Sequence, residues 1–218
     1  MPFGLTKLAP ETKRLLQELG LSRGQVSPRV LAALERLAQQ RDELQAQLAA
    51  AEELADRDAL APVLNRRAFL RELHRTMSEV ERYKTSAAVL YIDLDSFKSL
   101  NDQYGHAAGD AVLRQVGLLL LDSVRESDVV GRLGGDEFGV ILNRASAEEG
   151  AVKAQSLSDK INSSAILYAG VPHRIRASVG VHPIAAVEDP ETALARADEA
   201  MYADKHARRA QTQAFAGF

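Results

Sequence analysis

The stretch Arg132-Leu-Gly-Gly-Asp-Glu-Phe138 places two glycines and two carboxylates in direct succession between two short apolar runs, residues 128–133 and 138–142. A Gly-Gly pair used as a two-residue connection supplies the positive φ angles that a tight hairpin turn requires. Because glycine has no side chain, a bulky anionic group and its metal ion can approach the backbone there. The stretch therefore predicts a β-hairpin whose acidic tip binds nucleotide phosphates through Mg²⁺.

Helical and strand patterns alternate on both sides of this hairpin, from Asp58 onward. Helical periodicity covers residues 66–83, 111–124, 146–163 and 190–208, and strand patterns cover residues 87–92 and 174–182. A further short strand at residues 165–171 is expected at an edge. The order strand, helix, strand, strand, helix, strand predicts an α+β fold with a ferredoxin-like (βαββαβ) core.

This topology predicts that two distant carboxylates meet. Right-handed crossover makes the first and second strands parallel, with the third strand between them and antiparallel to both. The first strand ends at Asp93 and the third begins near Asp136, so both acids are expected at one rim of the sheet. With the backbone carbonyl of Leu94 they offer the hard oxygen ligands that suit Mg²⁺. The alternative is that both are ordinary exposed acids at strand ends.

The segment before Asp58 has a different pattern. Residues 1–26 contain one short amphipathic stretch, and residues 27–57 predict a single long helix with Ser27 as N-cap and Pro28 at the first helical position. Apolar or small residues recur at alternating spacings of four and three, namely Val30, Leu34, Leu37, Leu44, Leu48, Ala51 and Ala55. A 3.5-residue period predicts the seam of a dimeric coiled coil. The alternative is a helix that packs on its own domain.

Composition narrows the class of protein. The chain has 218 residues, of which 46% are hydrophobic and 26% charged, with a net charge of −3 and no cysteine. These values are typical of a globular protein and exclude disulfides and thiolate metal sites. The net charge of −3 does not indicate binding to nucleic acid. No apolar stretch is long enough to span a membrane. We expect a cytoplasmic protein with no nucleic-acid partner.

Three motifs together resemble the GGDEF family, the diguanylate cyclases. They are the segment Tyr91-Ile-Asp-Leu-Asp-Ser-Phe-Lys-Ser-Leu-Asn-Asp-Gln-Tyr-Gly-His-Ala-Ala-Gly-Asp110, the hairpin segment 132–138, and Asp198-Glu-Ala-Met-Tyr-Ala-Asp-Lys205. The resemblance covers residues 58–210 and leaves residues 211–218 as a C-terminal tail. It implies a palm-type nucleotidyl-cyclase core, with a metal site for Mg²⁺ (or Mn²⁺) formed by Asp93, Leu94, Asp136 and Glu137.

The resemblance also implies roles in binding GTP. Lys98, Gly134, Gly135, Lys205 and Arg209 would contact the phosphates; a one-residue shift would exchange Arg208 for Arg209. Asn101 and Asp110 would read the guanine edge. A carboxylate can accept from guanine N1–H and the exocyclic amine, whereas the adenine edge lacks those donors.

The reaction of the family condenses two GTP molecules into cyclic di-GMP and releases two pyrophosphates. Asp93, Asp136 and Glu137 would be the catalytic acids, with Glu137 as the candidate general base. One domain binds one GTP, so two domains of a homodimer must face each other, and the coiled coil would supply that encounter.

The segment Arg125-Glu-Ser-Asp128 matches an Arg-x-x-Asp inhibitory motif found at this spacing in many members of the family. Arginine can bind guanine O6 and N7, and the carboxylate can accept from guanine N–H groups. Product inhibition by cyclic di-GMP is therefore expected, with Lys160 as a candidate further cation. The alternative is a salt bridge at a helix end.

One motif departs from the family pattern. Asp58-Ala-Leu-Ala-Pro-Val-Leu-Asn-Arg-Arg67 has Ala61-Pro62 where the family usually has Thr-Gly, which predicts a stiffer hinge. Asn65 is expected to cap the following helix. Three other functions remain open: a catalytically silent cyclic di-GMP receptor that uses Arg125 and Asp128, a coiled-coil scaffold, and another transferase with the same palm.

Overall fold

The computed structural model describes residues 10–215 and divides the chain into two compact units, Met1–Ala55 and Asp56–Phe218. The first unit contains α1 (Pro10–Glu18), the short 3₁₀ helix η1 (Arg23–Gln25) and most of α2 (Pro28–Asp56). Helix α2 begins at Pro28 as predicted, and the Ser27 hydroxyl lies 3.4 Å from the backbone nitrogen of Val30. The long helix is confirmed. Residues 1–9 of the predicted N-terminal segment lie outside the described residues.

Helix α2 carries an exposed apolar stripe. Val30, Leu37, Leu44 and Leu48 are each at least half exposed, whereas Ala38 is buried. Leu37, Leu44 and Leu48 line one shallow hollow together with Gln40, Arg41 and Gln45. In a single chain, therefore, the predicted seam is open to solvent over most of its length.

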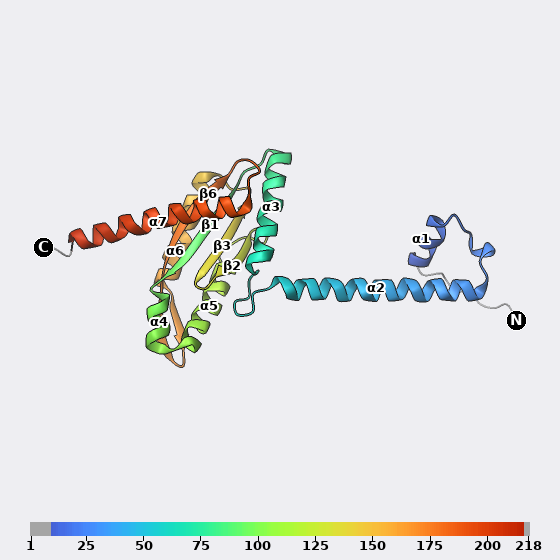
Figure 1. Ribbon diagram of the computed structural model, residues 1–218, viewed down its shortest axis with the longest axis horizontal. Helices are drawn as coiled ribbons and strands as arrows, with labels where there is room; N and C mark the ends of the chain where they lie inside the picture. Colours follow the sequence, from blue (N-terminus) through green and yellow to red (C-terminus); the bar gives the residue numbers. More distant parts are fainter. Residues whose placement is uncertain (1–9, 216–218) are drawn as a thin grey trace. The chain divides into compact units, whose positions relative to one another are not determined.

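The second unit is a sheet with helices on both faces (Figure 1). Its four strands are antiparallel to their neighbours in the order β2-β3-β1-β6. The strands are β1 (Ala87–Asp95), β2 (Val129–Gly134), β3 (Glu137–Asn143) and β6 (Arg176–Ile184). The first two strands are thus parallel with β3 between them. The predicted ferredoxin-like strand order and strand directions are confirmed.

The helices form two layers. The buried side chains of α3 (Arg66–Tyr83) and α7 (Pro190–Phe215) pack on one face of the sheet. Those of α4 (Phe97–Tyr104), α5 (His106–Leu121) and α6 (Ala147–Ser163) pack on the other. A separate hairpin consists of β4 (Ala165–Tyr168) and β5 (Val171–Arg174), so the short strand expected near residues 165–171 is part of this pair.

Side chains of β1 alternate between the two layers, as the pleat of a strand requires. Leu90 and Ile92 enter the core beneath α5 and α6, and Val89 and Tyr91 enter the core beneath α3 and α7. Helix α7 lies very close to β6: a Cβ on Gly180 would be 2.0 Å from the backbone oxygen of Ala197. This close packing sets the position of α7 on β6, and Lys205, one turn beyond Met201 on α7, reaches Asp93 near the end of β1.

Several predicted boundaries were wrong, for identifiable reasons. Helix α4 was not predicted, because only Phe97 and Leu100 of its eight residues are buried and give it little periodicity. The helix predicted at residues 111–124 begins earlier, at His106, and ends at Leu121. Strand β1 continues to Asp95 because its pairing with β6 extends that far.

The hairpin turn also differs from the prediction. Gly134 pairs with Glu137, so the two residues of the turn are Gly135 and Asp136 rather than the two glycines. Neither glycine has the left-handed φ that was predicted; among the described glycines only Gly20, Gly105 and Gly170 do. A register shift between Arg132 and Gly134 accounts for the difference, because it moves the turn one residue along the chain.

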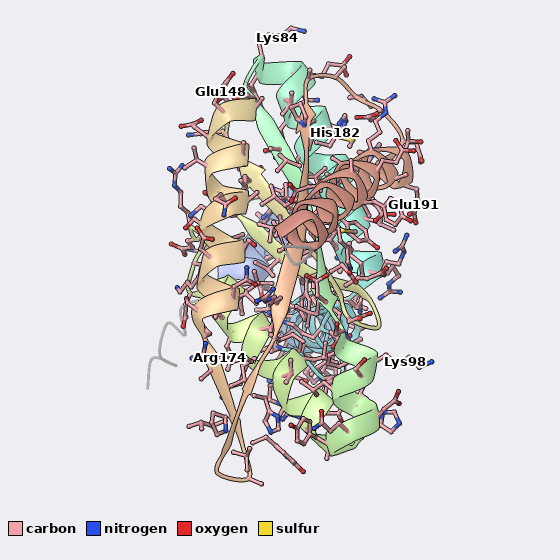
Figure 2. All side chains as sticks on the ribbon, turned by 90° about the vertical axis from the view of Figure 1, so that its left-hand side faces the viewer. Lys84, Lys98, Glu148, Arg174, His182 and Glu191 are labelled. Atoms are coloured by element: carbon pink, nitrogen blue, oxygen red, sulfur yellow. The ribbon has the colours of Figure 1, made fainter. Side chains whose placement is uncertain are left out.

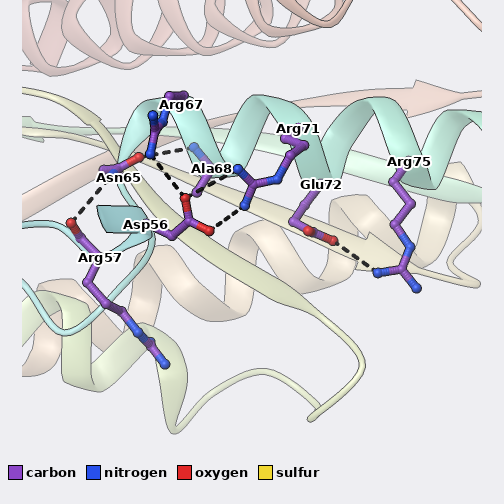
Figure 3. Close-up of polar contacts among 8 residues, drawn as sticks. All are labelled: Asp56, Arg57, Asn65, Arg67, Ala68, Arg71, Glu72 and Arg75. Carbon is purple, nitrogen blue, oxygen red and sulfur yellow. Dashed lines mark hydrogen bonds and ion pairs between the residues drawn. The ribbon is translucent and has the colours of Figure 1, made fainter. Parts of the chain in front are cut away.

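The segment between α2 and α3 is tied down by polar contacts (Figure 3). Asn65 caps α3 by accepting from the backbone nitrogen of Ala68 at 3.0 Å, which confirms the predicted cap, and its amide donates to the backbone oxygen of Arg57. Asp56 forms ion pairs with Arg67 and Arg71. The segment is therefore an ordered turn.

Ala61 and Pro62, which stand where the family usually has Thr-Gly, are packed into this turn. Ala61 and Val63 are 1% exposed. A Cβ on Gly117 of α5 would be 3.2 Å from both Ala61 Cβ and Pro62 Cδ, so the turn lies directly against α5. This packing supports the stiff hinge that the proline predicts.

Across the described residues, no helix has the length and apolar character that crossing a bilayer requires.

Replacing Asn65 by alanine removes the cap of α3 and the bond to Arg57. We expect the free energy of unfolding to fall by about 1 kcal/mol, the usual effect of losing an N-cap. Urea titration followed by circular dichroism measures this change. Asn65→Asp keeps the capping oxygen and should retain most of the stability; equal losses in both variants would contradict the capping role.

Candidate functional site

Three predicted acids meet where β1 ends against the β2–β3 hairpin. Asp93 is paired with Glu137 across the two strands. The backbone nitrogen of Leu94 donates to the backbone oxygen of Asp136 at 3.2 Å, which fixes the turn beside β1. The structure therefore brings Asp93 and Asp136 together at one rim of the sheet, as the topology predicted, and places Glu137 beside them.

A lysine from α7 neutralises part of this rim. The ammonium group of Lys205 forms ion pairs with Asp93 and with Asp95, the latter at 2.8 Å. Ser178 on β6 donates to Asp95 at 3.2 Å. The sequence analysis missed Asp95 and Ser178, although alternation along β1 would have placed Asp95 on the same face as Asp93.

The remaining charge at the rim is mostly negative. Burial raises the pKa of Asp136, and the negative charges of Asp93 and Glu137 raise it further against the opposing effect of Lys205. Burial also raises the pKa of Asp198 on α7, again with added repulsion from Glu137 and Asp93. A cation bound at the rim would relieve this repulsion.

Glu137 has a defined orientation. Its carboxylate accepts a hydrogen bond from Tyr91, whose pKa is raised by burial and by this contact. Its Oε2 atom lies over Gly134, where a Cβ would be 2.7 Å away. Any larger residue at position 134 would therefore displace the Glu137 carboxylate. The space beside Gly135, by contrast, is open.

Arg132 connects the hairpin turn to the Asp58 turn. Its Nε and Nη2 atoms donate to the backbone oxygen of Gly135 at 3.1 and 2.7 Å, and its Nη1 atom donates to Asp58 at 3.1 Å. Both side chains of this ion pair are 17% exposed. Burial alone would raise the pKa of Asp58, but backbone hydrogen bonds from Ala61 and Leu60, together with Arg132, lower it. Arg132 is a second contact that sequence analysis missed.

The oxygen donors at the rim suit a magnesium ion that also binds substrate. No three acidic, histidine or cysteine side chains of the described residues are arranged to hold a metal by themselves. Two carboxylates, Asp93 and Asp136, and the Leu94 carbonyl are instead the kind of partial set that Mg²⁺ completes with phosphate oxygens and water. The chemistry of the donors therefore fits the metal that was predicted.

The residues predicted to read guanine lie on α4 and α5. The side-chain oxygen of Asn101 is buried and has no hydrogen-bond partner among the described residues. It lies against Gly109, where a Cβ would be 1.9 Å away, and Asp110 is the next residue along α5. A buried acceptor without a partner is costly, which suggests that a ligand donor satisfies it. Lys98 projects outward from α4 (Figure 2).

The predicted inhibitory motif forms a compact turn after α5. The carboxylate of Asp128 accepts from the backbone nitrogens of Arg125 at 3.0 Å and Asn143 at 3.1 Å. Two lysines of α6 reach the same turn: Lys153 donates to the backbone oxygen of Ser123 at 2.9 Å, and Lys160 donates to its hydroxyl at 2.8 Å. Lys153 was not predicted; Lys160 was. Arg208 and Arg209 lie outside the residues whose side chains the structure describes.

A cleft of about 520 Å³ lies away from the rim, between α3 and the far ends of β1 and β3. Glu72, Arg75 and Arg144 are among its lining residues, and none of the predicted site residues lines it. The rim is therefore the candidate site on chemical grounds, because the acids and the lysine converge there.

The topology of the sheet and the acidic rim together define an α+β nucleotidyl cyclase-like fold. The sequence model of the family described as "Diguanylate cyclase, GGDEF domain" matches residues 55–211. The chain belongs to this family, and the resemblance seen in its sequence is confirmed.

Similar proteins include the probable diguanylate cyclase DgcE of Escherichia coli K12, 36% identical over 168 residues, which are 74% of this chain and 15% of DgcE. Diguanylate cyclase TpbB of Pseudomonas aeruginosa PAO1 is 34% identical over 181 residues, 82% of this chain and 41% of TpbB. The chain thus spans less than half the length of these curated relatives.

A solved structure of the coiled coil and GGDEF domain of DgcB from Caulobacter crescentus, in complex with cyclic di-GMP, is also similar. The TM-score is 0.72 at 28% identity, over 82% of this chain and 95% of the DgcB chain.

The pKa of Asp136 gives a prediction about stability. Because folding raises this pKa, the folded protein binds the proton more tightly, and the charged form lowers the stability at neutral pH. Asp136→Asn should raise the Tm at pH 7 without divalent ions by about 2 °C, after allowance for solvent screening at this partly buried group. The gain should disappear as the pH falls below the ordinary value of 3.8.

The matched variant Asp93→Asn removes one of the two ion-pair partners of Lys205 and should lower the Tm at pH 7. Differential scanning fluorimetry in EDTA measures both variants. A decrease for Asp136→Asn at pH 7 would contradict the charge crowding described for the rim.

Proposed function

We propose that this chain is a diguanylate cyclase that condenses two GTP molecules into cyclic di-GMP and two pyrophosphates across a homodimer. The observation that carries the proposal is the convergence of Asp93, Asp136 and Glu137 at one rim in a member of the GGDEF family. A cytoplasmic location belongs to the same proposal, because GTP is an intracellular nucleotide.

Asp93, Asp136, Glu137 and the Leu94 carbonyl would hold Mg²⁺ (or Mn²⁺). When bound, the ion activates the 3′-hydroxyl and offsets charge on the phosphoryl oxygens. Glu137, oriented by Tyr91, is the group that takes the proton of the 3′-hydroxyl. The 3′-oxygen bonds to the α-phosphorus of the other GTP as the bond to pyrophosphate breaks in line with it.

The guanine base is assigned to Asn101 and Asp110. The buried oxygen of Asn101 lacks a partner among the described residues and can accept from a guanine N–H group. The exposed Asp110 carboxylate is a second acceptor on the adjoining helix. Two acceptors favour guanine over adenine, whose corresponding edge lacks the N1–H donor.

The triphosphate is assigned to Lys98, Lys205 and Arg209, with the turn backbone at Gly134 and Gly135. Lys98 is an exposed cation that projects from α4, and Lys205 is already at the rim. The open space beside Gly135 leaves room for phosphate oxygens near the backbone.

A homodimer through α2 would bring two such half-sites together. The exposed leucines of α2 are the surface that a coiled-coil partner would cover, which supports this arrangement. Pairing through α2 would raise the effective concentration of one domain at the other. The similarity to the DgcB structure, which also includes a coiled coil, agrees with this arrangement.

Product inhibition is assigned to Arg125 and Asp128. Lys153 and Lys160 beside the same turn supply positive charge for the phosphates of cyclic di-GMP. The similar DgcB chain is bound to cyclic di-GMP, which supports recognition of this ligand but is compatible with a second function. That second function is a catalytically silent receptor or scaffold that binds through Arg125 and Asp128.

Incubation of the purified protein with GTP and Mg²⁺, followed by chromatography of the nucleotides, separates the two functions. We expect cyclic di-GMP from the parent chain and at least a hundredfold less from Asp136→Asn, because the rim loses one charged oxygen ligand. Asp159→Asn, an exposed acid of α6, is the matched control and should retain activity. No product from the parent, after removal of co-purified cyclic di-GMP, would favour the receptor.

The homodimer can be tested at Leu44, which is 65% exposed on α2. Leu44→Glu places a charge in the proposed seam and should lower product formation about tenfold or more at low protein concentration. Ala46→Glu adds the same charge at an exposed position away from the stripe and serves as control. Light scattering gives the mass of each variant; an unchanged dimer with Leu44→Glu would contradict the coiled coil.

A further inference from the structure

Lys205 is a cation that the chain itself supplies to the rim. Its ammonium group lies between Asp93 and Asp95, and the three side chains are only 17%, 20% and 24% exposed. A lysine ammonium between two carboxylates carries its full charge at neutral pH. Both carboxylates thus share one positive charge.

The two carboxylates have different surroundings. Asp93 is the last residue of β1 that pairs with β3, and it faces Glu137 directly. Asp95 lies beyond that pairing, and its neighbouring strand is β6, where Ser178 lies 3.2 Å from both of its carboxylate oxygens. Ser178 is 2% exposed, so this donor is fixed in place. Asp93 therefore faces the acids of the hairpin, whereas Asp95 is held on the β6 side by Ser178.

We propose that Asp95 is a positioning residue for Lys205, which it retains at the rim when a divalent cation takes Asp93. This inference rests on the proposed function, in which Lys205 binds substrate phosphates. Before a divalent cation binds, Lys205 is paired with the Asp93 carboxylate. The cation must therefore compete with Lys205 for that group.

The reason is electrostatic. A divalent cation and an ammonium group repel each other, so sharing the Asp93 carboxylate at close range is unfavourable. When the cation binds, Lys205 loses one of its two partners. With Asp95 in place the ammonium keeps the other, and it remains beside the rim where the phosphates bind. Without Asp95 the flexible lysine side chain would have only Asp93 as partner.

The competition can be measured without GTP, by electron paramagnetic resonance of Mn²⁺ added to the full chain. Lys205→Met removes the internal cation and should tighten Mn²⁺ binding about fivefold. Asp95→Asn leaves Lys205 with Asp93 alone and should weaken Mn²⁺ binding about threefold to fivefold. Asparagine has the shape of aspartate and still accepts from Ser178, so the fold should be retained.

The double variant separates positioning from direct metal ligation. If Asp95 acts through Lys205, Asp95→Asn should change Mn²⁺ affinity less than about twofold in the Lys205→Met background. If Asp95 were itself a metal ligand, the substitution would weaken binding equally in both backgrounds, and the proposal would be overturned. Tighter binding by the single variant Asp95→Asn would also overturn it.

A second readout uses GTP. Asp95→Asn should raise the KM for GTP several-fold with a smaller change in kcat, and Asp95→Glu, which restores the charge, should recover most of the loss. A several-fold fall in kcat with an unchanged KM for GTP would contradict the positioning role. Because the Mn²⁺ measurements contain no nucleotide, they test Asp95 even if the chain makes no cyclic di-GMP, so the two proposals can fail separately.

Discussion

Carboxylates from three different elements converge where β1 ends, and like charges this close repel one another unless a cation lies between them. Asp93 and Asp95 come from β1, Glu137 from β3, and Asp198 from α7. The surrounding structure offsets this repulsion locally. Close packing of α7 on Gly180 brings Lys205 to the rim, and Tyr91 donates to Glu137 from beneath. The same charge surplus that lowers stability is the charge that a metal ion would offset in the proposed function.

The order of the elements and the meeting of the acids could be predicted from the sequence, because both follow from chain-wide regularities. Period-2 alternation and right-handed crossover are enough to place Asp93 beside the hairpin. The turn itself could not be predicted, because a register shift between Arg132 and Gly134, at the buried Leu133, moves it off the Gly-Gly pair. A local rule for hairpins fails where a bulge intervenes.

Contacts between side chains that are distant in the sequence could not be predicted either. Asp95, Ser178 and Lys153 act through partners on other elements, and a single sequence carries no signal for such pairs. Lys160 was predicted only because the Arg-x-x-Asp motif of the family lies in the turn after α5 and such a site needs a further cation. Topology is thus enough to predict which acids meet at the end of β1. The ion pairs that these acids form depend on how α6 and α7 pack on the sheet.

Arg132 joins two parts of the domain that the sequence treats separately. One guanidinium group donates to the Gly135 carbonyl in the hairpin turn and to Asp58 in the turn that follows α2. The Asp58 turn is itself packed against α5 through Ala61 and Pro62, so it has little room to deform. One guanidinium group thus links the residues that follow α2 to the backbone of the hairpin turn that carries the acids.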